Sequence, residues 1–194
     1  MTTDIIKEIL KIMPENTIND AVFEGANIVL YTKDHDFFLN DRGLIRKAVS
    51  SVKKRIEIRP DPSMCIDQER AEQLIREIVD EEAGIDQIIF DPQRSQVIIE
   101  AEKPGMAIGK QGETLNEIKK QTYWVPLVKR KPAIRSQIIE NIRAVLYQNS
   151  DYRRKFLHKT GERIYNGWQR DRKEGWVRLT YLGGARQVGR SAIL

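Results

Sequence analysis

The hydrophobic and polar positions of this chain predict one run of secondary structure that occurs twice. In the first run, apolar residues fall on one helical face and then alternate with polar residues as they do in strands. The predicted elements are a helix at 3–13, strands at 20–24 and 27–32, a turn at 37–40, a helix at 44–52 and a strand at 55–59. Pro14 ends the first helix, and Pro60 follows the last strand.

The second run repeats this order 69 residues further along the chain. Its predicted elements are a helix capped by Asp67, strands at 85–90 and 96–102, a turn and helix within 104–122, and a strand at 123–128. At this offset Ile28 aligns with Val97, and Gly43 aligns with Gly112. The repetition indicates an internal duplication. We therefore expect an α+β fold with two small domains of the order helix-strand-strand-helix-helix-strand.

The second run contains the sequence Gly109-Lys110-Gln111-Gly112, directly after the apolar residue Ile108. Two helices joined by so short a glycine turn leave the backbone open to close approach by another backbone. The N–H groups that begin the next helix attract anions, and Lys110 adds a full positive charge. These properties suit a phosphodiester, and the pattern resembles the G-x-x-G loop of KH domains, which clamps single-stranded nucleic acid. The fold class then becomes two tandem type II KH-like domains.

A nucleotide-binding P-loop is the rival interpretation of the stretch from Gly105 to Lys110. That motif requires four residues between its glycines and Ser or Thr after the lysine. This stretch has three residues between its glycines, and Gln111 follows the lysine. The spacing therefore excludes a P-loop.

The first copy of the loop is degenerate. Its sequence is Asn40-Asp41-Arg42-Gly43, so one glycine is missing and Asp41 occupies the position of Lys110. A carboxylate repels phosphate, and asparagine only partly tolerates a backbone with positive φ. We expect the first copy to keep the fold without the clamp.

Two further helices are predicted after Pro132. Ser136 precedes the first helix, and Ser150 is expected to cap the second. The apolar face of the first helix carries Ile138, Ile139, Ile142, Val145 and Leu146. The basic residues of the pair are Arg135, Arg143, Arg153, Arg154, Lys155, Lys159 and Arg163.

The charge of the chain is uneven. Residues 129–173 hold 13 Lys and Arg against 4 Asp and Glu, whereas residues 1–128 hold 17 against 23. A solvated helical face would explain such a basic run. Beside a phosphate-binding loop, however, the run favours an extension of a nucleic-acid track.

These patterns predict four segments. They are a degenerate KH-like domain at 1–63, a KH domain with the GKQG loop at 64–131, a basic helical extension at 132–166, and a linker with a hairpin at 167–194. In the last segment, 176–182 alternates as a strand, 183–189 is glycine-rich, and 190–194 begins a returning strand. Because a lone hairpin is marginal in water, we interpret it as the opening of a further domain.

Three stretches carry a resemblance to one family: IGKQGETLNEIKK, IIENIRAVLYQNSDYRRKFL and WVRLTYLGGARQVGRSAIL. Together with the tandem repeat, they resemble the N-terminal region of the archaeal cleavage and polyadenylation specificity factor-like β-CASP ribonucleases, which act in transcription termination and RNA 3′-end processing. The resemblance implies that metallo-β-lactamase and β-CASP domains with two zinc ions follow the KH region. It also implies that the parent protein is a homodimer, and that the final hairpin opens the catalytic domain.

The chain itself lacks the zinc motif of that family. Its two histidines, His35 and His158, are far apart and belong to no His-x-His-x-Asp-His cluster, so we expect no metal, cofactor or catalytic residue here. The single cysteine, Cys65, is typical of a reducing compartment, and the N-terminus has neither a basic flank nor a long apolar run. A cytoplasmic protein without membrane association is expected.

The leading hypothesis is a single-stranded RNA-binding region, acting on U-rich RNA for a nuclease domain elsewhere. The predicted RNA-binding residues are Ile108, Gly109, Lys110, Gln111, Gly112, Lys129, Arg130 and Lys131. Tyr123 and Trp124 could stack on bases, although aromatic residues at a helix-to-strand junction more often belong to a core. The alternative is a protein-interaction platform, in which the acidic helix at 67–83 and the degenerate copy dock on RNA polymerase or other transcription machinery.

Overall fold

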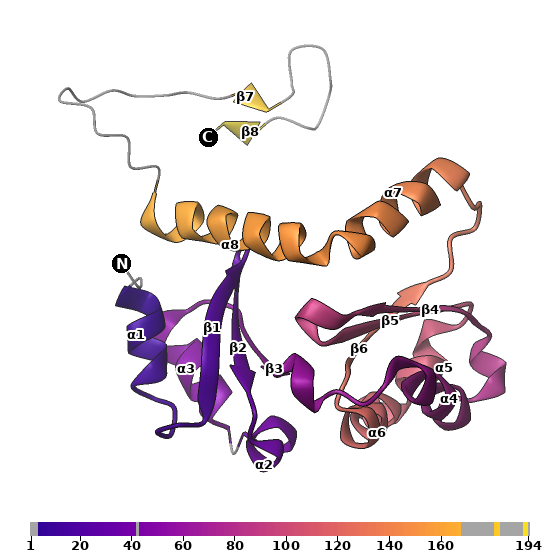
Figure 1. The fold of residues 1–194 in the computed structure, drawn as a ribbon, viewed down its shortest axis with the longest axis horizontal. Coiled ribbons are helices and arrows are strands. Elements are labelled where there is room, and N and C mark those ends of the chain that lie inside the picture. The colour runs from indigo at the N-terminus through magenta and orange to yellow at the C-terminus, as the bar shows by residue number, and fades with distance from the viewer. Residues whose placement is uncertain (1–3, 42, 168–180, 183–191, 194) are drawn as a thin grey trace.

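The computed structural model describes residues 4–41 and 43–167 and the strand segments 181–182 and 192–193. Two α+β units lie side by side, and two consecutive helices cross both of them on one side (Figure 1). The first unit consists of α1 (Asp4–Leu10), β1 (Ile18–Glu24), β2 (Asn27–Thr32), α2 (His35–Leu39), α3 (Leu44–Val52) and β3 (Ile56–Pro60).

The second unit has the same order of elements. It consists of α4 (Gln68–Ile78), β4 (Ile85–Asp91), β5 (Gln96–Ala101), α5 (Pro104–Ile108), α6 (Glu113–Thr122) and β6 (Val125–Arg130). Short 3-10 helices are η1 (Pro62–Met64), η2 (Glu81–Ala83), η3 (Pro92–Arg94) and η4 (Lys110–Gly112). In each sheet the central strand pairs antiparallel with the preceding strand and parallel with the last one. The predicted α+β order is confirmed in both units.

The duplication is visible in the element bounds. The pairs β2 and β5, α2 and α5, α3 and α6, and β3 and β6 each begin 69 residues apart. Strands β1 and β4 begin 67 residues apart. The offset predicted from the sequence therefore holds from the second strand of each unit to its last strand.

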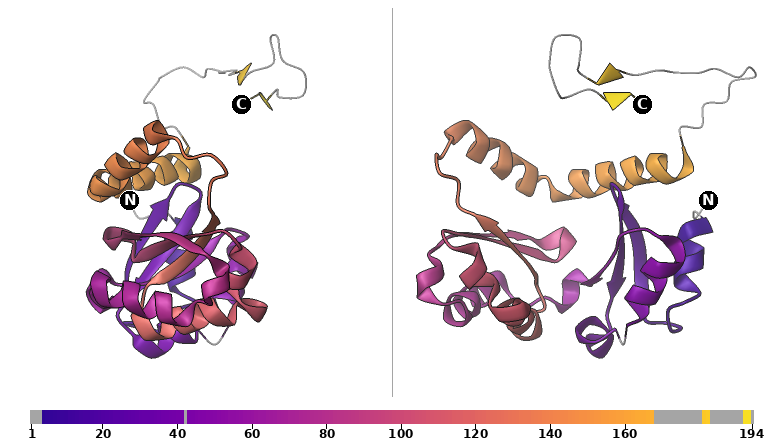
Figure 2. Two further views of the ribbon diagram at one scale, coloured as in Figure 1. Left: turned by 90° about the vertical axis from the view of Figure 1, so that its right-hand side faces the viewer. Right: turned by 180° about the vertical axis from the view of Figure 1, so that it is seen from behind.

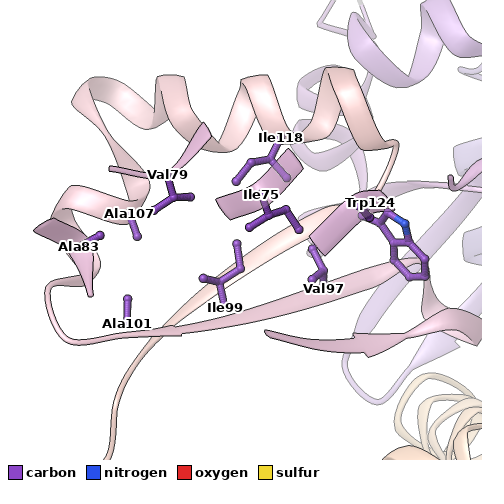
Figure 3. Packing of buried hydrophobic residues seen from close by; sticks show 10 residues of the cluster. Ile75, Val79, Ala83, Val97, Ile99, Ala101, Ala107, Ile118 and Trp124 are labelled. Atoms are coloured by element: carbon purple, nitrogen blue, oxygen red, sulfur yellow. The ribbon is translucent and has the colours of Figure 1, made fainter. Parts of the chain in front are cut away.

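Each sheet buries one face under its own helices. In the second unit, Val97 and Ile99 of β5 pack against Ile75 of α4 and Ile118 of α6, with all four side chains fully buried (Figure 3). The core of the first unit consists of Ile6, Ile9, Met13, Phe23, Ile28, Leu30, Phe37, Ala48 and Ile56. Two separate cores explain why the chain forms two units rather than one continuous sheet.

Helix α8 (Ser150–Asn166) packs on β1, the edge strand of the first sheet. Gly161 permits this contact, because an added Cβ would lie 2.2 Å from Cβ of Phe23 and 2.6 Å from the carbonyl oxygen of Gly25. The backbone N–H of Phe23 donates to Nδ1 of His158 at 3.2 Å, and that of Gly25 donates to the carbonyl of Leu157 at 3.0 Å. The helix thus satisfies backbone groups that an edge strand would otherwise expose.

Helix α7 (Gln137–Gln148) lies on the side of the second sheet opposite to α4, α5 and α6 (Figures 1 and 2). Arg143 of α7 makes a 2.8 Å ion pair with Glu100 of β5, whose side chain points away from the core residues Val97 and Ile99. The second sheet is therefore a middle layer between two sets of helices.

Several bounds differ from the sequence-based predictions; the acidic helix predicted at 67–83, for example, ends at Ile78. Asn149, rather than Ser150, is the N-cap residue of α8. Ser150 is buried instead, and its hydroxyl donates to the carboxylate of Asp91 at 2.6 Å. The last strand begins at Val125 rather than Tyr123, because Tyr123 ends α6 with φ of 57°. Helix α1 ends at Leu10, three residues before the predicted end.

The hairpin predicted at the end of the chain is described only in part. Strands β7 (Tyr181–Leu182) and β8 (Ala192–Ile193) pair antiparallel, with Tyr181 opposite Ile193. The predicted linker after Gly167 and the glycine-rich turn lie outside the described residues.

Candidate nucleic-acid interface

The GKQG loop joins α5 to α6 through backbone conformations that favour glycine. Gly109 has φ of 75° and ψ of 175°, and Gly112 has φ of 80° and ψ of 19°. Gln111 between them also has a positive φ, 53°. Gly112 is the N-cap residue of α6, and it has no side chain that could accept hydrogen bonds from the first N–H groups of the helix. The backbone N–H of Glu113 donates to the carbonyl of Lys110, whereas the following N–H groups of Thr114 and Leu115 receive no side-chain cap from Gly112.

Gly109 cannot be replaced without displacing its neighbours. A Cβ at this position would lie 2.3 Å from Oγ1 of Thr114 and 3.0 Å from its backbone nitrogen. The loop therefore packs its backbone directly against the first turn of α6. A Cβ added at Gly112 would have no other atom within 4 Å. Only the backbone conformation therefore requires glycine at this position.

The residues at the tip of the loop face solvent. Lys110 and Gln111 are exposed, and 36% of Ile108 is exposed at the end of α5. Within the described part of the chain, Lys110 forms no ion pair or hydrogen bond through its side chain. The ammonium group, the uncapped N–H groups and the positive end of the α6 dipole thus lie together at one surface site.

The structure separates the three basic residues predicted beside the loop. Val128 of β6 packs toward the helix-side core, so alternation places Arg130 on that face and Lys129 on the opposite face of the sheet. Lys129 and Arg130 are both exposed. Lys131 instead donates to Glu102 at 2.9 Å and lies 3.3 Å from Asp86, and these hydrogen bonds raise its pKa.

The two aromatic residues after α6 are structural. Trp124 is 3% exposed and lies at one end of the core of the second unit (Figure 3). Its Nε1 donates to the carbonyl of Ile66 at 2.9 Å, and its ring meets the ring of Phe90 edge-on. Tyr123 contacts the ring of His35 at a centroid distance of 4.7 Å and that of Phe38 at 6.3 Å. The interpretation of these residues as core is thus confirmed for Trp124, and Tyr123 joins the two units.

The first copy of the loop differs at the position of the lysine. The carboxylate of Asp41 accepts a 2.9 Å hydrogen bond from the backbone N–H of Ile45, in the first turn of α3. The backbone carbonyl of Asp41 accepts from Leu44 at 2.9 Å. Asn40 is extended, with φ of −144°, where Gly109 has φ of 75°. The carboxylate of Asp41 thus lies at the N-terminus of α3, where an external phosphate would otherwise bind. This contact gives a physical reason to expect that the first loop does not clamp nucleic acid.

The same region of the first unit packs against the second unit. Nζ of Lys119 in α6 lies 4.1 Å from the ring centroid of Phe38 in α2. Burial lowers the pKa of this lysine, while the charge of Asp41 opposes that shift. The surface next to the degenerate loop is therefore occupied by protein.

Most arginines of the basic helices bind acidic groups of the two units. Arg143 pairs with Glu100, Arg153 with Asp91 at 2.9 Å, Arg154 with Asp20 at 2.9 Å, and Arg135 with Asp86. These four guanidinium groups therefore pair with carboxylates of the two units, and the extension of a nucleic-acid track along the basic run stays a prediction. Lys155 and Lys159 are exposed on α8.

A buried ion network joins the two units. Glu24 of β1 is bound by Arg59 at 2.9 Å from within the first unit and by Arg94 at 2.5 Å from the second. Burial alone would raise the pKa of Glu24, but the hydrogen bonds and charges of the two arginines outweigh it and lower the pKa. Sequence patterns did not indicate this pair, since Glu24 and Arg94 are 70 residues apart.

The described residues contain neither a metal-binding cluster nor a membrane-spanning helix. Within 4–41 and 43–167, no group of three or more His, Cys, Asp or Glu side chains is arranged to hold a metal ion. None of the helices described is both long enough and apolar enough to cross a membrane.

Comparison with known proteins identifies both units as KH domains. A family profile described as "Transcription termination factor FttA, KH domain" matches residues 1–65, and a profile described as "KH domain" matches residues 70–123. The chain thus contains two KH domains in tandem and is similar to the KH region of transcription termination factor FttA. The predicted resemblance to the KH region of an archaeal termination factor is thereby confirmed.

The curated proteins that the chain resembles come from several archaea. The chain is 45% identical to transcription termination factor FttA of Thermococcus kodakarensis and 44% identical to that of Methanocaldococcus jannaschii. Each match covers 98% of this chain and 30% of the relative. FttA of a Lokiarchaeum species is 34% identical over 93% of this chain. The chain thus spans about 30% of the length of the curated relatives that it matches.

Proposed function

We propose that the second KH unit binds single-stranded RNA through the loop Gly109 to Gly112, in the service of transcription termination. The observation that carries this proposal is the open N-terminus of α6, next to an exposed Lys110 without an ionic partner among the described residues. The corresponding helix of the first unit is closed by Asp41. The names of the matched FttA relatives support a role in termination.

The geometry suggests how the strand is held. A phosphate would accept hydrogen bonds from the first N–H groups of α6, and Lys110 would add an ion pair. The absence of side chains at Gly109 and Gly112 lets the sugar-phosphate backbone approach the loop closely. Ile108 then offers an apolar contact for a base, while Arg130 extends the positive charge along β6. We choose U-rich RNA as the first ligand because uridines stack weakly on one another and so expose their bases.

RNA processing and contact with RNA polymerase extend this proposal. We infer that the bound RNA is presented for 3′-end processing to a zinc-dependent metallo-β-lactamase and β-CASP nuclease region of the parent protein, in the cytoplasm. In this proposal the chain contributes RNA binding, and the nuclease region contributes cleavage. Contact with RNA polymerase would bring the KH region to nascent RNA.

Lys110→Asp tests the proposal directly, because it installs the residue of the first copy. The new carboxylate can accept the N–H of Thr114 as Asp41 accepts that of Ile45. Loss of a charge-assisted contact costs about 1.5–3 kcal/mol, so we expect affinity for U-rich RNA to fall about tenfold to a hundredfold in fluorescence anisotropy. The circular dichroism spectrum should not change.

The matched control is Asp41→Lys, which makes the opposite exchange in the first copy. It adds positive charge to the chain but leaves Asn40 in place of the first glycine, so RNA affinity should change little. Equal affinity of Lys110→Asp and wild type would contradict the proposal. A comparable gain in Asp41→Lys would show that net charge, rather than the loop, determines binding.

A protein-docking role is the second candidate, and one observation favours it. The exposed side of α4 and η2 carries Glu69, Glu77, Asp80, Glu81 and Glu82. Such a face repels RNA and suits a basic protein surface. Polymerase recovered from nuclease-treated extract by wild type and by Lys110→Asp in equal amounts would support protein docking. Recovery that depends on intact RNA would support the first proposal.

A further inference from the structure

Helix α3 and its connection to β3 carry a concentration of positive charge that the second unit lacks. Residues 44–55 hold five Lys and Arg and no Asp or Glu, a balance of +5. The aligned stretch of the second unit, 113–124, holds two cations and two anions, a balance of 0. Both helices nevertheless pack against the cores of their own units. The fold itself therefore does not require this charge.

The five cations face solvent. Arg46 and Lys47 lie in the first turn of α3, Lys53 is its C-cap residue, and Lys54 and Arg55 lead into β3. Within the described part of the chain they form no ion pair, unlike the arginines of α7 and α8. Nζ of Lys54 lies 5.7 Å from the ring centroid of Tyr165 in α8. We call Arg46, Lys47, Lys53, Lys54 and Arg55 the α3 cations.

The α3 cations lie along one strip of the helix. Ser50 and Ser51 are exposed between Lys47 and Lys53, so the strip is polar from end to end. Glu8 of α1 borders it, and its carboxylate accepts a 3.0 Å hydrogen bond from the hydroxyl of Ser51. At a rise of 1.5 Å per residue, Arg46 and Lys53 are roughly 10 Å apart. That length matches about three phosphates of one stacked nucleic-acid strand.

Local stability does not explain the α3 cations. The helix dipole favours cations at the C-terminus of α3, but it opposes Arg46 and Lys47 in the first turn. Lys53 has φ of 54°, a conformation that glycine adopts at lower cost. In the second unit Tyr123 has φ of 57°, and ring contacts with the first unit hold it there. Lys53 has no such contact among the described residues, and strain kept without packing points to a ligand.

The chemistry of the strip narrows the ligand. Helix α3, which the structure describes in full, carries no exposed large apolar side chain. A lipid surface and a specific protein partner both require apolar or aromatic anchors in addition to charge. The backbone of a nucleic acid requires only cations, because each neutralised phosphate releases a counterion. Phosphate contacts also read no bases, which agrees with a strip that contains only cations and serines.

We propose that the α3 cations bind the phosphate backbone of the RNA strand that the GKQG loop holds, outside the nucleotides at the loop. This inference rests on the proposed function of the loop. A KH loop takes about four nucleotides, so a longer strand has phosphates to spare. Helix α6 begins at the loop and contacts α2 through Lys119 and Phe38, and α2 precedes α3 in the first unit (Figure 1). The second contact is therefore intramolecular and gains from effective concentration.

The test uses two U-rich RNAs, one of about six nucleotides for the loop alone and one of about 24 nucleotides for both sites. The double variant Arg46→Gln with Lys47→Gln should bind the short RNA as wild type does. Its affinity for the long RNA should fall about tenfold in fluorescence anisotropy. The slope of log affinity against log salt should become less steep by about 1.4, or 0.7 for each lost phosphate contact.

The matched control is Lys33→Gln with Arg70→Gln, which removes the same charge from two exposed cations outside the strip. It should leave both affinities and the salt slope close to wild type. An equal loss in this control would overturn the inference, because net charge alone would then explain the effect.

Lys53→Gly separates a binding role from a structural one. Glycine relieves the backbone at φ of 54°, so the variant should unfold at a higher temperature than wild type. Its affinity for the long RNA should nevertheless fall. A lysine kept for stability would instead lower the unfolding temperature when replaced and leave RNA binding unchanged.

The two RNAs also distinguish this inference from the proposed function. Equal affinity of wild type and Arg46→Gln with Lys47→Gln for the long RNA at every salt concentration would overturn the inference, while binding of the short RNA keeps the loop as a site. Failure of wild type to bind the short RNA would contradict the proposed function, and the salt slope on the long RNA would still report the α3 cations. Phosphatidylglycerol vesicles that bind wild type but not the double variant, with the long RNA unaffected, would assign the strip to a lipid surface.

Discussion

The two KH units of this chain share an order of elements, a sheet topology and a 69-residue offset. They differ at the N-terminus of the helix that follows the loop, α3 in the first unit and α6 in the second. In the first unit the carboxylate of Asp41 accepts the N–H of Ile45. In the second unit Gly112 leaves the corresponding N–H groups uncapped, and Lys110 adds a cation. The two loops thus differ in whether an aspartate of the chain caps the helix that follows.

The comparison also shows what the first unit contributes instead. Its edge strand β1 carries α8, and Glu24 at the end of β1 binds Arg94 of the second unit. Its helix α2 packs against α6 and Tyr123. The first unit keeps the fold although its loop differs, because the fold depends on the core, and its contacts with α6 and Arg94 hold it against the second unit.

The largest expected effect concerns the ion network between the units. Glu24→Gln leaves Arg59 and Arg94 without the buried negative charge that binds both, and breaking a buried pair costs about 3–5 kcal/mol. Urea unfolding should show a loss of this order. The control is Glu72→Gln in the exposed pair with Arg76, where the loss should be about 0.5 kcal/mol or less. Equal losses would show that the network does not couple the units.

The next effect separates the two loops at their first position. Gly109→Ala must move Thr114 and hold alanine at φ of 75°, so the free energy of unfolding should fall by about 1–3 kcal/mol, and RNA affinity should fall with it. Asn40→Ala changes a residue with φ of −144° and should lower stability by at most about 1 kcal/mol. Thermal unfolding and anisotropy on both variants measure the difference; a smaller loss in Gly109→Ala would refute it.

The third effect separates the loops at their second position. Asp41→Ala removes the cap of α3 and should lower the free energy of unfolding by about 1 kcal/mol without changing RNA affinity. Lys110→Ala should do the reverse, because its side chain binds no described residue: stability stays within about 0.5 kcal/mol while RNA affinity falls. Denaturation and anisotropy on the pair of variants form the test. Parallel changes in both variants would mean that the copies have not diverged in role.

The smallest effect is the dependence of stability on acid. Glu24 has a pKa below its ordinary value of 4.5, so near that pH the unfolded chain binds a proton that the folded chain does not. Stability is therefore present above pH 4.5 and is lost as pH falls through the lower, folded-state pKa. Part of this loss should be missing from Glu24→Gln in unfolding curves from pH 6 down to about pH 3. Identical slopes in the two proteins would contradict the assignment to Glu24.

Much of the fold followed from local pattern. The strand bounds of both sheets were predicted within two residues or so because alternation and helical periodicity depend on neighbours in the chain. The sequence also contained a signal for the cap of α3, since an aspartate shortly before an apolar helix commonly caps its N-terminus. The alignment of Asp41 with Lys110 predicted only that the carboxylate repels phosphate. The separation of Lys129 from Arg130 also follows from alternation, once β6 is known to begin at Val125.

The sequence by itself determined the duplication, the order of the elements and the difference between GKQG and NDRG, because these depend on residue types at short range. Only the tertiary structure decided which charged side chains form ion pairs with one another. Arg154 meets Asp20 across 134 positions, and Arg143 meets Glu100 across 43, so arginines of the basic run also bind the two helices to the KH units. The same contacts turned the polar side of α7 inward and its apolar side outward. Burial and ion pairing are properties of three-dimensional neighbours, and no periodicity along the chain reports them.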